Sequence, residues 1–167
     1  MNATRDARAS EQVRIVDFQP DLRAHFYRLN AAWLQKYFRM EPIDELVLAQ
    51  PEQEILEPGG AILFALSDGA VVGTCALKRE SEGVYELTKM AVDESHQGLG
   101  LGRRLIEAAI AEFQRRGGTR LFLETNSKLT PAVRLYESVG FEHQPGGKPD
   151  SHYERSNVYM IWRSGVS

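Results

Sequence analysis

The sequence predicts an α+β fold, a mixed and mostly antiparallel central sheet with flanking helices. Two observations predict this class. In the first half of the chain, three strand-like runs follow one another through short turns, which favours antiparallel pairing. In the second half, a strand, a long amphipathic helix and a further strand follow in order, and such a crossover makes its two strands parallel. At 167 residues, with 43% hydrophobic and 26% charged residues, the composition is typical of one globular domain.

The N-terminal elements are a strand and two helices. Residues 13–18 form a β-branched run and are expected to be the first strand. A helix opened by Pro20 is predicted over residues 20–38, because apolar side chains recur three or four positions apart. These side chains are Leu22, Phe26, Leu29, Trp33 and Tyr37. A second helix is predicted over residues 43–50 and is expected to stop at Pro51.

A turn at residues 58–60 leads into the strand-rich part of the chain. Residues 61–66 and 70–78 are apolar runs separated by Ser67-Asp68-Gly69, which predicts a β-hairpin. Residues 84–92 follow a turn and form a third run. The connections are too short for a crossover, so we expect these three strands to pair antiparallel.

The crossover unit begins with a helix predicted over residues 101–116, which Gly117-Gly118 ends. Its apolar face carries Gly102, Leu105, Ile106, Ala109, Ile110 and Phe113. Residues 120–125 form the strand that follows, expected to lie parallel to residues 84–92.

The C-terminal elements are a short helix and a closing strand pair. Thr130-Pro131 supplies an N-cap and an N1 proline for a helix that runs to Val139. Gly140 is suited to the left-handed conformation that ends such a helix. Residues 141–144 and 153–163 are expected to be the closing strands.

The charge distribution and the cysteine content limit the classes of function that this chain can have. The net charge is −3 and both signs are interspersed, which argues against nucleic acid as a partner. No apolar run is long enough to span a membrane, and the four histidines lack metal-ligand spacing. The single cysteine, Cys75, lies in an apolar run and is expected to be a core thiol. We therefore expect a cytoplasmic domain over residues 1–167 with no membrane and no metal, and residues 1–11 as a disordered tail.

Residues 97–102 read Gln-Gly-Leu-Gly-Leu-Gly between a strand and a helix. Alternating glycines let a loop turn its N–H groups toward a phosphate, and the following helix adds the positive end of its dipole. A dinucleotide-binding fold would use Glu124 to bind the ribose, but the glycines miss the third position of its motif and lie too far from the strand. A P-loop is excluded because Gly-Lys-Ser/Thr is absent.

Three segments together resemble the GNAT superfamily of acetyl-CoA-dependent N-acetyltransferases. They are Leu-Thr-Lys-Met-Ala-Val (87–92), the glycine loop (97–102), and Ala-Val-Arg-Leu-Tyr-Glu-Ser-Val-Gly-Phe (132–141). The loop matches the family pattern (Arg/Gln)-x-x-Gly-x-(Gly/Ala), and Leu-Tyr-x-x-x-Gly-Phe matches its second signature. The resemblance spans residues 13–162 and implies the GNAT fold, in which the parallel strand pair splays apart and the pantetheine arm fills the gap.

The resemblance also implies which residues bind acetyl-CoA, the cosubstrate. The positions that match the family's pantetheine strand and pyrophosphate loop are Met90, Ala91, Val92, Gln97, Gly98, Gly100, Gly102 and Arg103. Many members carry an asparagine seven residues before the signature tyrosine, where this chain has Leu129. Asn126 is the candidate replacement, and the alternative is a loop asparagine bonded to nearby backbone.

Two residues match the family's catalytic groups. A glutamate at the position of Glu86 deprotonates the amine, which is needed because an alkylammonium with a pKa near 10.4 is not nucleophilic at neutral pH. Ideal alternation would put Glu86 on one strand face with Met90 and Val92. A tyrosine at the position of Tyr136 protonates the departing thiolate. The alternative for Glu86 is a solvated carboxylate on the strand, and the alternative for Tyr136 is an aromatic side chain that only packs.

The expected activity is acetyl transfer from acetyl-CoA to a primary amine by direct attack, because Cys75 lies outside the expected cleft and no Ser-His-acid set is suggested. The alternative is an inactive CoA-binding sensor or interaction module, against which both Glu86 and Tyr136 argue. The acceptor is an amine-bearing small molecule or peptide that no motif identifies. Trp33 and Arg155 are candidates for its pocket, and a homodimer is compatible with the sequence.

Overall fold

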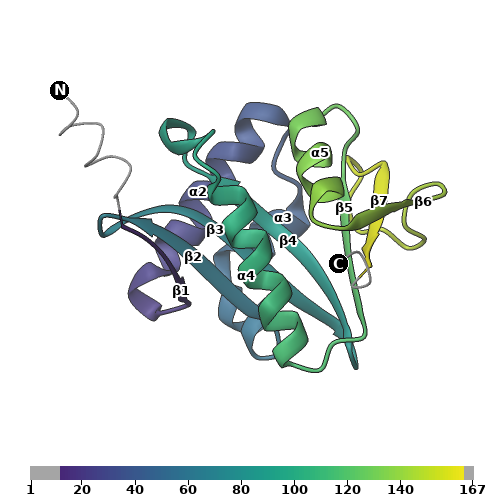
Figure 1. Cartoon of the computed structure of the whole chain (residues 1–167), viewed down its shortest axis with the longest axis horizontal. Coiled ribbons are helices and arrows are strands. Elements are labelled where there is room, and N and C mark those ends of the chain that lie inside the picture. Colours follow the sequence, from purple (N-terminus) through teal and green to yellow (C-terminus); the bar gives the residue numbers. More distant parts are fainter. Residues whose placement is uncertain (1–11, 164–167) are drawn as a thin grey trace.

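The computed structural model describes residues 12–163, so the tail expected over residues 1–11 lies outside the described part. A seven-stranded sheet runs through the molecule in the order β1-β2-β3-β4-β5-β7-β6 (Figure 1). Its strands are β1 (Val13–Asp17), β2 (Ala61–Ser67), β3 (Ala70–Ser81), β4 (Val84–Val92), β5 (Arg120–Thr125), β6 (Phe141–Gln144) and β7 (Val158–Trp162). Neighbouring strands are antiparallel except for the parallel pair β4 and β5. The predicted α+β class and mixed sheet are confirmed.

Helices cover both faces of this sheet. They are α2 (Arg23–Tyr37), α3 (Pro42–Ala49), α4 (Leu101–Arg115) and α5 (Thr130–Ser138), with the short turns η1 (Pro20–Leu22), η2 (Glu52–Leu56) and η3 (Glu94–His96). One hydrophobic cluster joins α4 and α5 to one face, and a second joins α2 and α3 to the other. Figure 1 shows α4 lying across the strands with α2 and α3 behind them. Within residues 12–163, no helix has the length and apolarity needed to cross a bilayer.

Helix α4 owes its position to the apolar stripe predicted from the sequence. Its buried side chains are Leu101, Leu105, Ile106, Ala109, Ile110 and Phe113. Each fully buried leucine, isoleucine or phenylalanine contributes about 1.5–3 kcal/mol relative to an exposed position. The stripe therefore fixes α4 on the sheet and, with it, the glycine loop at the start of the helix.

Some element boundaries differ from the predictions. Leu129 is the N-cap of α5, so Thr130 is already helical and does not cap it. The last strand is shorter than the predicted 153–163, because the segment before Val158 is a loop held by contacts to α3. The chain also forms the π-helical turn η2 directly after Pro51, where only a stop was expected.

A β-bulge in β4 changes which side chains share a face. Thr74 of β3 pairs with Ala91, but Ala76 pairs with Thr88, so β4 holds one extra residue between these pairs. Lys89 lies there with a φ of 54°, in the left-handed region. The expectation that Glu86 and Met90 share a face is therefore wrong. A Cβ on Gly102 of α4 would lie 3.9 Å from Met90 Cε, so Met90 faces α4.

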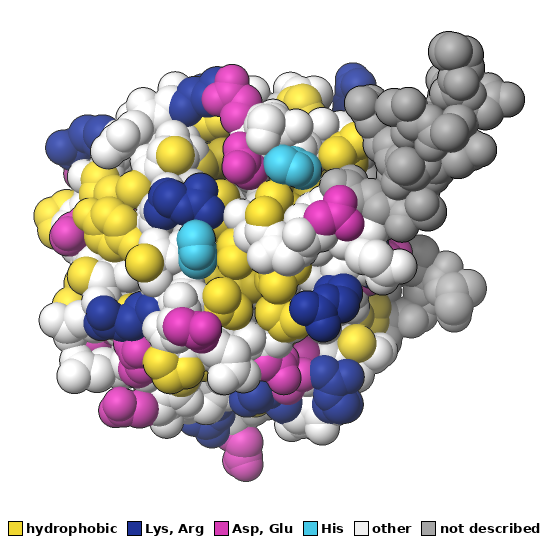
Figure 2. Space-filling model, turned by 90° about the vertical axis from the view of Figure 1, so that its left-hand side faces the viewer, with side chains coloured by type: hydrophobic (Ala, Val, Ile, Leu, Met, Phe, Trp, Pro, Cys, Tyr) yellow, Lys and Arg dark blue, Asp and Glu magenta, His cyan; other side chains and the backbone are white. Residues whose placement is uncertain are grey.

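The molecular surface carries mixed charge. On the face shown in Figure 2, Lys and Arg side chains alternate with Asp and Glu side chains and do not gather by sign. Nucleic-acid binding requires a basic patch or stripe, and this face presents none among the described residues.

Candidate active site

The parallel strands β4 and β5 separate part-way along their length. Val84–Glu86 pairs with Arg120–Phe122, and no pairing between the two strands extends further. Beyond Glu86, β4 keeps β3 as its partner on one side only, and β5 continues against β7. This leaves backbone N–H and C=O groups of β4 facing a gap, where an extended ligand can pair as an additional strand.

A cavity occupies this gap and continues to the α2 side of the sheet. Its lining combines α2, both splayed strands, α5 and the segments around residues 126–129 and 153–156. The lining includes Asn30, Trp33, Phe38, Glu86, Lys89, Met90, Glu124, Asn126, Leu129, Tyr136, Tyr153 and Arg155. The cavity thus extends from the unpaired edge of β4 to the side chains of α2.

The glycine loop opens α4 in the conformation that an anion site needs. Gly98 and Gly100 have φ values of 83° and 78°, and Gly100 is the N-cap of α4. A Cβ at either position would meet no atom within 4 Å, so the space above the loop is open. At Gly102, a Cβ would lie 3.2 Å from Leu135 Cδ2, which lets α5 approach α4 closely. N–H groups of the first helical turn point into that open space.

The other predicted cofactor residues have local partners. The Gln97 Nε2 group is 3.4 Å from the Val92 carbonyl oxygen. The Arg103 guanidinium donates to Ser138 Oγ at 2.6 Å. Asn126 donates to the carbonyl of Arg155 at 2.6 Å and accepts from the Lys128 N–H at 2.9 Å. Asn126 thus bonds one nearby and one distant backbone group while it lines the cavity.

Glu86 lines the cavity on the α2 side of the bulge. Burial first, and then the charge of Glu124, raise the pKa of its carboxyl to about 7, against the opposing charges of Lys89 and Lys78. A carboxyl with a pKa near neutrality can accept a proton and return it at physiological pH.

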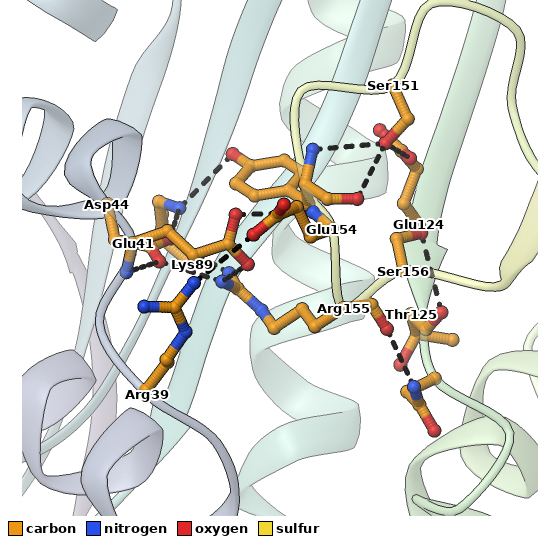
Figure 3. Close-up of polar contacts among 12 residues, drawn as sticks. Arg39, Glu41, Asp44, Lys89, Glu124, Thr125, Ser151, Glu154, Arg155 and Ser156 are labelled. Carbon is orange, nitrogen blue, oxygen red and sulfur yellow. Dashed lines mark hydrogen bonds and ion pairs between the residues drawn. The ribbon is translucent and has the colours of Figure 1, made fainter.

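Glu124 is a site residue that the sequence analysis weighed only as a ribose ligand. It lies on β5 two residues beyond Phe122, which pairs with Glu86, so both carboxylates are on the same face of the sheet. Ser151 Oγ donates to Glu124 at 2.5 Å (Figure 3). The parallel pairing of β4 with β5 is the signal that could have identified Glu124 as a neighbour of Glu86.

Tyr136 lines the cavity from α5, with its ring edge-on to Phe141 at 6.0 Å between centroids. Burial raises the pKa of its hydroxyl, which therefore stays protonated across the neutral range. Cys75 is fully buried, and burial raises the pKa of its thiol to about 12. The expected core role of Cys75 is confirmed, because a thiol in this state is not nucleophilic.

A buried polar cluster, the Asp44 cluster, consists of the charged residues Glu41, Asp44, Lys89 and Arg155, labelled in Figure 3, together with Tyr153. Lys89 Nζ contacts Asp44 Oδ1 at 2.9 Å and the Tyr153 hydroxyl at 3.2 Å. The Arg155 guanidinium donates to both Asp44 oxygens at 2.7 and 2.8 Å and to Glu41 at 2.9 Å. The cluster joins α3, β4 and the loop before β7.

Burial alone would raise the pKa of Asp44, but the hydrogen bonds from Arg155 and Lys89 lower it to about 2. Arg155, a candidate for the acceptor pocket, does line the cavity. Its positive charge is nevertheless neutralised by the carboxylates of Glu41 and Asp44, to which it donates hydrogen bonds.

A sequence model described as the Acetyltransferase (GNAT) family matches residues 23–141. This chain belongs to the GNAT family. The matched region contains both splayed strands, the glycine loop, α4 and α5. The family resemblance identified from three short motifs is therefore confirmed over most of the chain.

Relatives of this GNAT chain act on different molecules. It is 35% identical over 92 residues to an N-acetylaspartate synthetase from Xenopus tropicalis, covering 52% of this chain and 32% of that protein. It is 46% identical over 78 residues to [ribosomal protein bS18]-alanine N-acetyltransferase from Escherichia coli K12, covering 47% and 53%. The chain thus spans a third to a half of these relatives' lengths.

The solved structure of a putative acetyltransferase from Salmonella typhimurium, with its cofactor acetyl-CoA, shares the fold. The TM-score is 0.72 at 23% identity, and the likeness covers 91% of this chain and 94% of that one. The arrangement of the sheet around the splayed pair is therefore that of the GNAT fold, as predicted.

Proposed function

We propose that the protein transfers the acetyl group of acetyl-CoA to a primary amine by direct nucleophilic attack. The observation that carries this proposal is the gap between β4 and β5, with the glycine loop at one end and Glu86 and Tyr136 on its walls. The family relatives named as N-acetyltransferases support it. The acceptor is an amine of a small molecule or a peptide.

The residues present fit acetyl-CoA. Backbone groups of Met90, Ala91 and Val92 would pair with the pantetheine arm, because β4 has no β5 partner there. The loop from Gln97 to Gly102 would take the pyrophosphate through its N–H groups, since the two left-handed glycines leave open space above them. Arg103 would add a positive charge from the first turn of α4.

The proposed chemistry needs one base and one acid. Glu86 accepts a proton from the acceptor ammonium, and the free amine attacks the thioester carbonyl carbon. The new C–N bond forms, the C–S bond breaks, and Tyr136 donates its proton to the leaving sulfur. An acetyl-CoA-binding sensor without catalysis is the alternative, but two ionisable groups suited to these steps line one cavity.

The function is tested by binding and turnover together. Coenzyme A at a hundred times its Kd should stabilise the fold by about 2.7 kcal/mol, or about 5–10 °C in Tm for a domain of this size. Thiol release from acetyl-CoA should then depend on an added amine. Stabilisation by NAD or ATP in place of coenzyme A would overturn the cofactor assignment, and binding without amine-dependent turnover would favour the sensor.

Gly100→Val should weaken coenzyme A binding by about tenfold to a hundredfold, because the new side chain fills the space above the loop and strains a left-handed residue. Gly117→Val is a matched control at the other end of α4, with a φ of 71° and no atom within 4 Å of a Cβ. Both variants should lose about 1–3 kcal/mol of stability. Calorimetry that returned equal coenzyme A affinity for the two would show that the loop does not bind the phosphates.

Tyr136→Phe should reduce kcat by about tenfold and leave both substrate affinities unchanged. General acids typically contribute about 10²–10⁴-fold, but a thiol with a pKa near 8.5 leaves well without help. Packing against Phe141 is retained, so Tm should barely change. Single-turnover rates measure the chemical step, and equal rates in the two proteins would make Tyr136 a packing residue.

A further inference from the structure

Two carboxylates face the cavity from the two splayed strands. Glu86 on β4 and Glu124 on β5 both line it, and each is only partly exposed. The negative charge of Glu124 is the second-largest cause of the raised pKa of Glu86, after burial. An acceptor nitrogen that reaches the thioester therefore approaches a region of negative potential.

The two cations that line the same cavity do not offset this potential. The guanidinium of Arg155 and the ammonium of Lys89 are each bonded to the carboxylate of Asp44, which is completely buried. Glu41 accepts a further bond from Arg155. The two positive and two negative charges of the Asp44 cluster sum to zero, and its cations already have their anions.

The other charges near Glu86 lie outside the cavity lining. Lys78 is opposite Glu86 in the β3–β4 ladder, and Lys148 pairs with Glu80 at 3.6 Å. Under α2 the lining itself is uncharged, with Asn30, Trp33 and Phe38, and the ammonium of Lys128 lies outside it, 4.2 Å from the centroid of the Phe38 ring. Aromatic rings at this wall suit an apolar or cationic flank better than an anionic one.

We propose that Glu124 makes the site selective for amines that carry no carboxylate next to the reacting nitrogen, such as alkylamines, amino-acid amides and peptide N-termini. This inference rests on the proposed function and names its acceptor class. A free amino acid would place a third carboxylate beside Glu86 and Glu124, with Lys89 and Arg155 already paired. Like charges in a partly desolvated site repel strongly, and specificity against a competitor is often built this way.

The test compares matched acceptors with the full-length protein. Alanine, alaninamide and an Ala-Ala-Ala peptide amide are assayed by thiol release from acetyl-CoA. The kcat/KM values are expressed per free amine, because the amide lowers the pKa of the amino group. We expect alaninamide to exceed alanine by about a hundredfold or more. The peptide amide distinguishes a macromolecular acceptor from a small one, since only an acceptor site open beyond the first residue accepts it.

Glu124→Gln retains the shape of the side chain and removes its charge, so the preference for alaninamide over alanine should fall by about tenfold. Glu142→Gln is the control, because Glu142 is exposed on β6 and outside the cavity. Its preference should equal that of the wild type. The wild-type ratio tests the inference even if Glu124→Gln does not fold.

Equal kcat/KM for alanine and alaninamide would overturn the inference and leave acetyl transfer intact. An unchanged ratio in Glu124→Gln would remove Glu124 as its cause. Tight coenzyme A binding with no turnover of any amine would instead overturn the proposed function, and the acceptor class with it.

Discussion

Glu86→Gln is expected to lower kcat/KM for the acceptor amine by about 10²–10⁴-fold, the usual contribution of a general base. The pKa of Glu86 is raised to about 7, by burial first and then by Glu124. Wild-type kcat/KM should therefore rise with pH through about 7, as the carboxyl loses its proton and becomes able to accept one. The variant should lose this rise and keep only the increase caused by deprotonation of the free amine near its own pKa.

The measurement is a pH profile of kcat/KM with one amine acceptor, together with calorimetry for coenzyme A. Coenzyme A affinity should be unchanged, because Glu86 lies beside the expected reaction centre and away from the glycine loop. Glu142→Gln, an exposed position on β6 and outside the cavity, should follow the wild-type profile. A variant profile with the same rise near pH 7 would assign that rise to another group and return Glu86 to a structural carboxylate.

Asp44→Asn is expected to lower the free energy of unfolding by about 3–5 kcal/mol, because it leaves the buried Lys89 ammonium without its carboxylate partner and Arg155 with Glu41 alone. The Asp44 side chain is completely buried and contacts Lys89 and Arg155, whose side chains are 4% and 19% exposed. It also accepts the Glu41 N–H at the start of α3. An amide can accept at only one of its two positions, so part of this network must break.

The sign of the pH effect follows from the lowered pKa of Asp44. Its contribution to stability is fully present above the unfolded value near 3.8 and is lost as pH falls through about 2. The difference between the wild type and Asp44→Asn should therefore be constant near neutral pH and shrink below about pH 4. Urea unfolding at several pH values measures it.

Glu154→Gln is the control for this experiment. Glu154 pairs with Arg39 at 3.2 Å, but both side chains are about four-fifths exposed. Exposed pairs contribute about 0–1 kcal/mol, so this variant should unfold nearly as the wild type does. Equal stability of Asp44→Asn and Glu154→Gln would mean that the buried cluster adds nothing to the fold.

Features that depend on neighbours in the chain were predicted well. The alternation of runs and turns gave β2, β3 and β4, and the stripe beginning at Leu101 gave α4 with its buried face. Glycines marked the points where the backbone takes positive φ, including Gly98, Gly100 and Gly140. Such signals lie within a few residues, and they place the glycine loop at the start of α4 because local backbone geometry decides where a loop turns into a helix.

Element ends and the bulge were not predictable in the same way. Residues 153–157 were predicted to begin the last strand, yet they form a loop because Arg155 bonds Asp44 of α3 and Asn126 bonds the Arg155 carbonyl. Lys89 takes a positive φ without being glycine. Its ammonium reaches Asp44 on the side of the sheet that also carries Glu86, which regular alternation would not allow for two residues three positions apart.

The sequence by itself determined the fold class, the family and the loop that would hold the cofactor, because each depends on periodicity or on a short motif. The tertiary structure alone decided how the charged groups that line the cavity are brought together. Asp44, Lys89 and Arg155 come from α3, β4 and the last loop, and Glu124 meets Glu86 only through the register of β4 and β5. Residues so far apart in the chain interact only after the sheet has formed, so no local pattern records their partners.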